Sequence, residues 1–351
     1  MSESGQGSRL AQEIAEQPAV IRRLLDLERD NVAALAGFFR ERNPHCIVIA
    51  ARGSSDNVAR YAKYLLGAVT GLPVALATPS LLTVYNQSLH LENTLVIGIS
   101  QSGQSPDIVA VLAEGARNGA LTVAVTNDLE SPLAQAAKHC INLQIDSEKS
   151  VAATKTYTAS LTALAMLAAA LDANHDRSRS LDQIPDLLLQ MIAGGDAIRD
   201  AAQRYRQMEA CVVIGRGYNY ATAFEIALKL KELAYILAEP YSSADFWHGP
   251  VALVEDGFPV IAVVPESPAA RELEELLAYL RSRGADLVVL SPRADVLKLA
   301  ETPISLPENV PEWLSPIVSV VPGQYFALGL TLAKGLDPDR PRGLRKVTRT
   351  L

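Results

Sequence analysis

The sequence predicts an α/β fold made of two doubly wound parallel sheets in tandem. Short apolar runs, separated by segments of helix length, recur along the chain, and runs of this kind are typical of parallel strands buried on both faces. The pattern occurs twice. The chain has 351 residues, which is enough for two domains of ordinary size.

The first half begins with helices and continues as a sheet. Residues 9–40 carry apolar side chains at helical spacing and predict one or two leading helices. A helix over 155–171 closes this half, and the polar stretch 172–183 is typical of a linker. The strands expected between them are the apolar runs at 46–51, 73–78, 94–100, 121–126 and 140–145.

The second half repeats this plan, with expected strands at 211–215, 259–264, 286–291 and 303–307. The uncharged stretch 313–333 approaches the length of a membrane span, but prolines and a glycine interrupt it, so we expect a buried segment followed by a core helix. The predicted organisation is N-terminal helices at 1–40, a first domain at 41–172, a linker at 173–200, a second domain at 201–335 and a tail at 336–351.

Composition excludes several classes of protein. The 39 acidic residues exceed the 32 basic ones, so the chain lacks the positive charge that nucleic-acid binding requires. The N-terminus has no secretory signal pattern, and the three cysteines are predicted as buried thiols in a reducing cytoplasm. The histidines and cysteines have no metal-ligand spacing. We therefore expect a cytoplasmic protein with no metal, no cofactor and neither nucleic acid nor membrane as partner.

An internal repeat relates the two halves. CIVIAARGSSDN (46–57) and CVVIGRGYNY (211–220) both read as a strand, an Arg-Gly turn and the start of a helix. TLVIGISQSGQSPDI (94–108) has PVIAVVPESPAA (259–270) as its counterpart. A loop rich in hydroxyl groups therefore survives only in the first copy.

This loop predicts a phosphate site. It follows a strand directly, and Pro106 is a favoured first residue of a helix, so the loop ends at a helix N-terminus that attracts anions. Gly103 would let the backbone approach the anion. Ser54 and Ser55 follow the first strand, and ligands of such sheets bind where strands end, so both loops can meet one ligand. The predicted loop donors are Ser100, Gln101, Ser102 and Ser105.

These loops have two other interpretations. In the first, Ser105 only caps a helix, which would contribute about 1 kcal/mol to stability, and the other serines are solvated turn residues. Dinucleotide binding at 215–217 fails, because Tyr220 stands where the fingerprint needs its third glycine.

The segment 221–237 predicts a largely buried helix with one narrow polar face. Glu225, Lys229 and Glu232 fall within a sector about 60° wide at helical periodicity. This arrangement suits a site. The alternative is a solvent-exposed stripe in which a Glu225–Lys229 pair contributes a few tenths of a kcal/mol.

Six motifs together resemble the sugar isomerase (SIS) superfamily. The resemblance covers nearly the whole chain and is strongest to the isomerase half of glucosamine-6-phosphate synthase and to the stand-alone type II glucosamine-6-phosphate deaminases. The motifs are EIAEQP (13–18), RGSS (52–55), SQSGQS (100–105), EKSVAATK (148–155), ALKLKELAYILAEPYSSADFWHGP (227–250) and DRPRGLRKVT (339–348).

The resemblance implies catalytic and binding roles for particular residues. Aldose–ketose isomerisation needs a base that moves a proton between C2 and C1, and Glu232 matches that position. Lys229 would lie beside the substrate hydroxyls, His248 would open the sugar ring, and Lys346 corresponds to the lysine that forms a Schiff base in the synthase. Without the resemblance, His248 reads as a loop residue and 336–351 as a frayed basic tail, although 339–342 suggests a fixed turn. The implied substrate-binding residues are Gly53, Ser54, Ser55, Ser100, Gln101, Ser102, Ser105, Val151 and Ala153.

The chain also departs from the synthase pattern. Arg52 replaces a cysteine and Ala153 replaces a serine, and the sequence begins directly at the isomerase half, without a glutaminase nucleophile. The resemblance therefore implies a homodimeric deaminase that converts glucosamine 6-phosphate and water to fructose 6-phosphate and ammonia, with His248 supplied by the partner. Alternatives are a deaminase or isomerase of another sugar phosphate, such as galactosamine or fructosamine phosphate, or a non-catalytic sugar-phosphate sensor.

Overall fold

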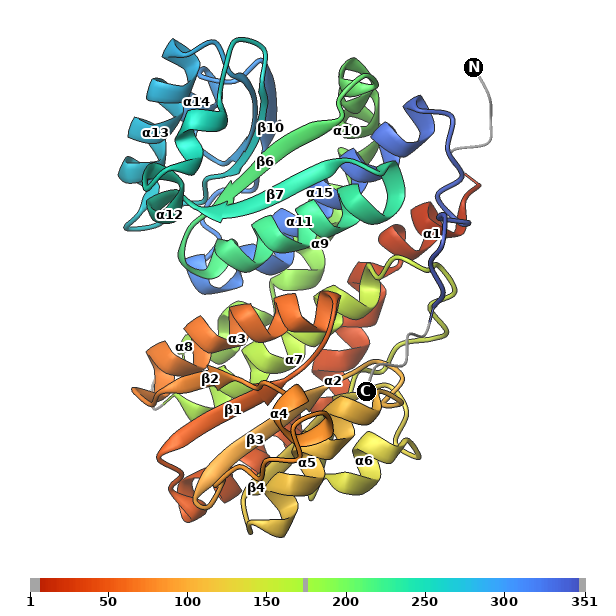
Figure 1. Ribbon diagram of the computed structural model, residues 1–351, viewed down its shortest axis with the longest axis vertical. Helices are drawn as coiled ribbons and strands as arrows, with labels where there is room; N and C mark the ends of the chain where they lie inside the picture. The colour runs from red at the N-terminus through yellow and green to blue at the C-terminus, as the bar shows by residue number, and fades with distance from the viewer. Residues whose placement is uncertain (1–6, 173–175, 347–351) are drawn as a thin grey trace. The chain divides into compact units, whose positions relative to one another are not determined.

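The computed structural model describes residues 7–172 and 176–346, which form two compact units. Of the described residues, the N-terminal unit comprises 19–148, 155–172, 176–183 and 345–346. The C-terminal unit comprises 7–18, 149–154 and 184–344. Each unit holds one five-stranded sheet (Figure 1). All pairs of neighbouring strands are parallel, which confirms the predicted α/β fold of two parallel sheets.

The sheet of the N-terminal unit has the order β2-β1-β3-β4-β5. Its central strands β3 and β4 are buried at every position, as their unbroken apolar runs predict. The five predicted strands are all present. Their bounds are β1 (Cys46–Ala50), β2 (Val74–Leu76), β3 (Thr94–Ile99), β4 (Leu121–Thr126) and β5 (His139–Asn142).

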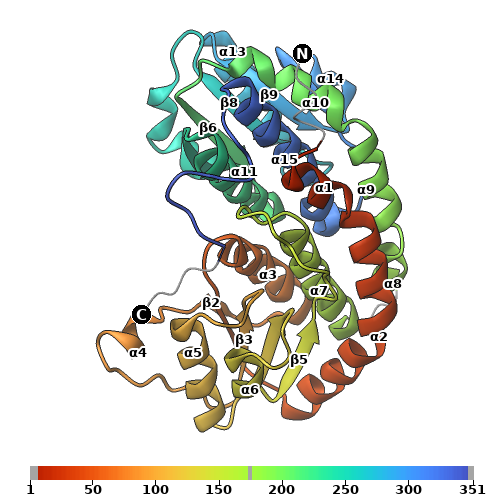
Figure 2. The ribbon, with the colours of Figure 1, turned by 90° about the vertical axis from the view of Figure 1, so that its right-hand side faces the viewer.

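Helices cover both faces of this sheet (Figure 2). On one face, α3 (Ser54–Thr70) packs against α7 (Lys155–Leu171), which is buried over most of its length. On the other face, α5 (Pro106–Arg117) contacts α4 (Ser80–Thr83), α6 (Pro132–Ala136), β3 and β4. The leading helix α2 (Gln17–Arg42) reaches β5, where Asn31 donates a hydrogen bond to the carbonyl of Cys140. The stretch 172–183, predicted as a linker, includes α8 (Asp176–Leu181).

The sheet of the C-terminal unit has the order β10-β9-β8-β6-β7. Four of its strands were predicted: β6 (Ala210–Gly215), β8 (Pro259–Val263), β9 (Asp286–Ser291) and β10 (Thr302–Ser305). The sequence prediction missed β7 (Leu237–Ser242). This strand lies at the sheet edge, where Glu239 and Pro240 are tolerated, so it lacks the apolar run of a central strand.

Figure 1 shows two helical layers around this second sheet. One layer holds α11 (Tyr220–Ala234), α15 (Ser315–Ala333), α10 (Gly195–Ala202) and α9 (Ile184–Ala193), with α1 (Arg9–Ala15) beside α15. The other layer holds α12 (Ser243–Trp247), α13 (Ala270–Ser282) and α14 (Ala294–Leu297). The helix predicted at 221–237 thus ends three residues early, where Tyr235 adopts a left-handed conformation.

The uncharged stretch near the C-terminus begins with a buried 3-10 turn, η5 (Glu312–Leu314), and continues as one core helix, as expected. Helix α15 continues through Pro322 and is buried from Ser315 to Thr331. A Cβ at Gly323 would lie 2.4 Å from Cγ1 of Ile226, so this glycine allows α11 and α15 to approach closely. The 22-residue segment containing α15 is apolar and long enough to cross a membrane, but 89% of its most apolar window is buried inside the protein.

The cysteines differ from the prediction. Cys211 is buried as expected, and burial raises the pKa of its thiol to about 12. Cys46 and Cys140 are only half-buried. Both lie at sheet positions where one side of the strand is partly open, so an apolar run alone did not establish their burial.

Candidate active site

The loop 100–105 connects β3 to α5 and is held in one conformation. The Ser100 N–H donates to the carbonyl of Val125, and the Leu133 N–H donates to the carbonyl of Gly103. Gly103 has φ +60°, and a Cβ there would lie 2.1 Å from Oγ of Ser131. Only glycine therefore fits this position of the loop.

The same loop presents unused hydrogen-bond donors. Among residues 7–172 and 176–346, no partner accepts from the backbone N–H groups of Gln101, Ser102 and Ser105. Ser105 occupies the N-cap position of α5, but its side chain makes no capping hydrogen bond. The capping explanation for its hydroxyl is therefore wrong, and the loop has the free donors that an anion site needs.

The second predicted loop lies beside the first. Strands β1 and β3 are neighbours in the sheet, and Ala50 lies opposite Gly98, so both loops leave the same edge. Gly53 precedes α3 with φ +56°, and Ser54 and Ser55 form the first turn of that helix. The two loops are thus brought together as the sequence predicts for ligand binding at strand ends.

A charged triad lies on α11. The Nζ of Lys229 is 3.3 Å from Oε1 of Glu225 and 2.5 Å from Oε2 of Glu232. The side chains of Lys229 and Glu225 are 1% and 0% exposed, because α11 packs against α15, β6 and β7. The solvent-exposed stripe is therefore wrong for this pair.

The neighbouring carboxylates keep Lys229 charged. Burial alone would lower the pKa of Lys229, but Glu225 and Glu232 outweigh burial and raise it above its ordinary value. The lysine stays an ammonium and balances one of the two carboxylates. Glu232 is the more accessible acid, with 23% of its side chain exposed, so it is the carboxylate that a ligand can reach.

The predicted residues Val151 and Ala153 lie in a segment fixed by α1. The carboxylate of Glu13 accepts hydrogen bonds from the backbone N–H groups of Lys149 and Ser150. Glu13 itself is buried, which explains why a carboxylate belongs in the motif 13–18. Val151 and Ala153 are half-buried.

The tail carries Lys346 to a buried carboxylate. The Nζ of Lys346 is 2.7 Å from Oε2 of Glu148, whose side chain is 0% exposed. Glu148 also accepts hydrogen bonds from the N–H and the hydroxyl of Thr156. The sequence interpretation included Glu148 in a motif but gave it no role, because its partner comes from nearly 200 residues away.

The tail is anchored upstream of Lys346. Asp339 accepts hydrogen bonds from the N–H groups of Arg9 and Leu10 at the start of α1. The N–H of Arg342 donates to the hydroxyl of Tyr235, and its guanidinium lies 4.4 Å from the centre of that ring. The frayed-tail alternative is therefore wrong for 336–346, and 347–351 lie outside the described residues.

His248 lies apart from the charged residues of α11 in the hydrogen-bond pattern of the described residues. It is exposed, it follows α12, and its backbone N–H donates to the carbonyl of Asp245. Within the described ranges, no hydrogen bond links its ring to Glu232 or Lys229. Across the same ranges, no group of three histidine, cysteine, aspartate or glutamate side chains could hold a metal ion.

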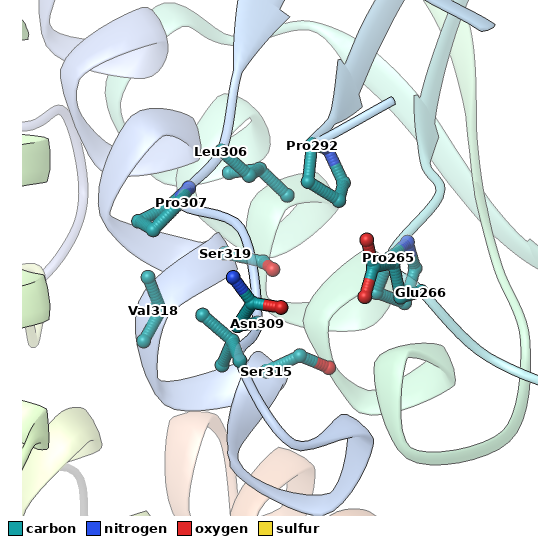
Figure 3. A pocket seen from close by; sticks show the side chains of 10 residues that line it. Pro265, Glu266, Pro292, Leu306, Pro307, Asn309, Ser315, Val318 and Ser319 are labelled. Carbon is teal, nitrogen blue, oxygen red and sulfur yellow. The ribbon is translucent and has the colours of Figure 1, made fainter. Parts of the chain in front are cut away.

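The corresponding edge of the second sheet carries a different pocket (Figure 3). Pro265, Pro292 and Pro307 follow the ends of β8, β9 and β10 and line this pocket together with Glu266. Proline has no N–H, so these positions offer no backbone donor to an anion. The structure thus agrees with the sequence comparison, in which only the first copy retains the hydroxyl-rich loop.

Comparison with known proteins decides the family. The model of the SIS domain matches residues 42–170 and again 205–334, one match for each sheet. The chain belongs to the SIS domain family. The predicted resemblance is confirmed, and these ranges are the first and second SIS domains below.

This SIS chain is similar to proteins whose names refer to sugar phosphates. A glutamine–fructose-6-phosphate aminotransferase (isomerizing) of Methanothermobacter thermautotrophicus is 34% identical over 96% of this chain. The match covers 56% of that relative, so the chain spans little more than half of its length.

Two solved structures share the fold over nearly the whole chain. A candidate phosphosugar isomerase from Silicibacter pomeroyi is 36% identical, with a TM-score of 0.83, and covers 95% of this chain and 100% of its own. A glucosamine-6-phosphate deaminase from Thermotoga maritima is 19% identical, with a TM-score of 0.74, and covers 98% and 100%; this likeness shows the fold alone.

Proposed function

We propose that this SIS chain is an amino-sugar-phosphate deaminase that converts glucosamine 6-phosphate and water to fructose 6-phosphate and ammonia. The observation that carries the proposal is the triad on α11, in which buried Lys229 holds the reachable carboxylate of Glu232. A carboxylate fixed in this way suits a proton transfer between neighbouring carbons.

The 6-phosphate group would bind at loop 100–105. Its free N–H groups and hydroxyls, at the start of α5, provide charge-assisted hydrogen bonds of about 1.5–3 kcal/mol each. Ser54 and Ser55, on the neighbouring strand end, would contact the same ligand.

The reaction would proceed on the open-chain sugar. His248 would assist ring opening, in the role that the family resemblance gives it. Glu232 would take the proton from C2 and return it to C1, while a second proton passes from the C2 nitrogen to the C1 oxygen, so that C1 becomes an alcohol and the C2 amine becomes an imine. Water then adds to C2 and ammonia leaves, which gives the ketone. Lys229 would hold Glu232 and bind substrate hydroxyls.

Deamination is preferred to synthesis because of the motif variants. Arg52 and Ala153 differ from the synthase pattern, and the segments 52–55, 152–155 and 344–348 resemble the stand-alone deaminases more closely. The aminotransferase relative supports a second candidate, the isomerase half of a synthase, in which Lys346 would form a Schiff base with the ketose. By the same resemblance we expect a cytoplasmic homodimer, in which the partner supplies His248.

The test is to supply glucosamine 6-phosphate and measure ammonia and fructose 6-phosphate together. The proposal requires both products in equal amounts, and high concentrations of free ammonium should drive the reaction backward. Galactosamine and fructosamine phosphates are assayed in parallel. Turnover of one of these alone would overturn the substrate assignment, and binding without turnover of any of them would favour the sensor alternative.

A further inference from the structure

Arg52 connects the two loops of the phosphate site. It follows β1, and its Nε lies 2.8 Å from Oδ2 of Asp107 in the first turn of α5. Because β1 and β3 are neighbouring strands, this contact links the loop that follows β1 to the helix that begins after loop 100–105. The side chain of Asp107 is 0% exposed, while that of Arg52 is 49% exposed.

Only part of the guanidinium is used by the fold. Among the described residues, the two terminal nitrogens of Arg52 have no hydrogen-bond partner, and Nε alone contacts Asp107. Asp107 is fixed in turn, since its Oδ1 accepts from the N–H of Ile108. The contact with the buried Asp107 uses one of the five N–H donors of the guanidinium. The remaining donors of Arg52 are left for a ligand.

We propose that Arg52 binds the substrate phosphate directly and that Asp107 is the positioning residue that aims it. This inference rests on the proposed function of loop 100–105. Neither that loop nor Ser54–Ser55 contains a cationic side chain, so their neutral donors leave a phosphate dianion unbalanced. The planar fork of arginine matches phosphate oxygens in pairs and adds a full positive charge.

The experiment is a calorimetric titration with inorganic phosphate, which requires no turnover. We expect Arg52→Cys to weaken phosphate binding at least tenfold. Arg52→Lys keeps the charge but loses the fork, and should fall between Arg52→Cys and the wild type. Asp107→Asn should also weaken binding, because Arg52 loses its anchor. Arg29→Cys is the matched control: Arg29 is 47% exposed, pairs with Asp182 in the same unit, and should leave phosphate affinity unchanged.

A double variant separates binding from a structural role. Arg52→Cys leaves a buried carboxylate without its cation, which could disturb the fold around the loop. Arg52→Cys with Asp107→Asn removes that charge as well. If Arg52 binds phosphate, the double variant melts near the wild-type temperature and still binds phosphate at least tenfold more weakly. Recovery of wild-type affinity in the double variant would show that Arg52 only neutralises Asp107, and would overturn the proposal.

Failure of this proposal and failure of the deaminase assignment are distinguishable. The chain could bind phosphate through Arg52 and yet deaminate no amino-sugar phosphate. That result would support the role of Arg52 and contradict only the proposed deaminase reaction. Deamination with unchanged phosphate affinity in Arg52→Cys supports the reaction and removes the role of Arg52. Absence of phosphate binding in the wild type overturns the proposal directly.

Discussion

The two SIS domains place opposite chemistry at equivalent strand ends. After β3, loop 100–105 offers three free backbone N–H groups and several hydroxyls. After β8, the corresponding loop carries Pro265 and Glu266 (Figure 3). Pro265 has no backbone N–H to donate, and Glu266 adds a negative charge. The backbone plan is shared, so we expect any affinity for an anion to depend on the loop residues and not on the fold.

The helices that follow the first strand of each sheet differ in the same way. On α3, Asp56 and Arg60 form an ion pair at 3.0 Å whose side chains are about one-third exposed. On α11, the pair of Glu225 and Lys229 has the same spacing of four residues but is buried. A pair that stays in contact with solvent contributes little, whereas a buried pair becomes costly once one partner is lost.

The two SIS domains therefore differ in their polar groups. The first has free donors at its strand ends, and the second has charged side chains on a buried helix. If this is correct, matched substitutions in the two copies should have unequal effects.

The largest expected effect is on stability. Lys229→Met leaves Glu225 buried without its cation and should lower the free energy of unfolding by about 3–5 kcal/mol. Arg60→Met, in the partly exposed pair of the first copy, should cost about 0.2–1 kcal/mol. Chemical denaturation of both variants measures the difference.

The pH dependence of the Lys229→Met variant provides a further check. Without Lys229, burial raises the folded-state pKa of Glu225 above its unfolded value, so protonation favours the folded state. The deficit in stability should therefore shrink as the pH falls through that raised pKa. Equal losses for Lys229→Met and Arg60→Met at neutral pH would contradict the contrast between the two helices.

The next largest effect concerns turnover. Glu232→Gln keeps the shape of the side chain and removes its basicity, so turnover of glucosamine 6-phosphate should fall by about 100-fold or more while phosphate still binds. Glu239→Gln is the control, because Glu239 is an exposed acid on β7 that pairs with Lys231. Near-normal turnover in Glu232→Gln would remove Glu232 from the mechanism.

Much of this arrangement was predictable from local patterns. Unbroken apolar runs predicted nine of the ten strands found in residues 7–172 and 176–346, because the central strands of a parallel sheet are buried on both faces. The edge strand β7 was missed because its exposed positions tolerate Glu239 and Pro240. Helical periodicity placed Glu225, Lys229 and Glu232 on one face of a helix.

Tertiary contacts decided what periodicity could not. The polar face of α11 could be solvated or buried, and only the packing of α15 shows that Glu225 and Lys229 are inside. The same holds for Asp107 and Glu148, whose partners Arg52 and Lys346 are distant in the sequence. Pairing across such separations depends on the folded chain and leaves no local signal.

A smaller effect on catalysis is expected from a substitution in loop 100–105. Ser102→Ala should raise KM for a sugar phosphate by about ten- to 150-fold, which corresponds to the loss of one hydrogen bond of about 1.5–3 kcal/mol to a charged group. The unphosphorylated sugar, already a poor substrate, should change little. Ser267→Ala, in the corresponding loop of the second SIS domain, is the matched control. An equal loss on both substrates would show that loop 100–105 does not bind the phosphate.

The smallest effect is expected at the proline-lined pocket of the second SIS domain. Glu266→Gln removes the negative charge there, yet it adds no backbone donor, because Pro265, Pro292 and Pro307 still lack N–H groups. The variant should therefore keep its stability within about 0.5 kcal/mol, as an exposed substitution does, and gain no phosphate site. Titration of Glu266→Gln with inorganic phosphate, alone and combined with Ser102→Ala, measures this through the stoichiometry per chain. We expect the same single site as in the wild type, weakened when Ser102→Ala is present. The contrary result is a second phosphate site in Glu266→Gln that Ser102→Ala leaves unaffected. It would show that the negative charge, and not the missing N–H donors, keeps phosphate from the strand ends of the second SIS domain.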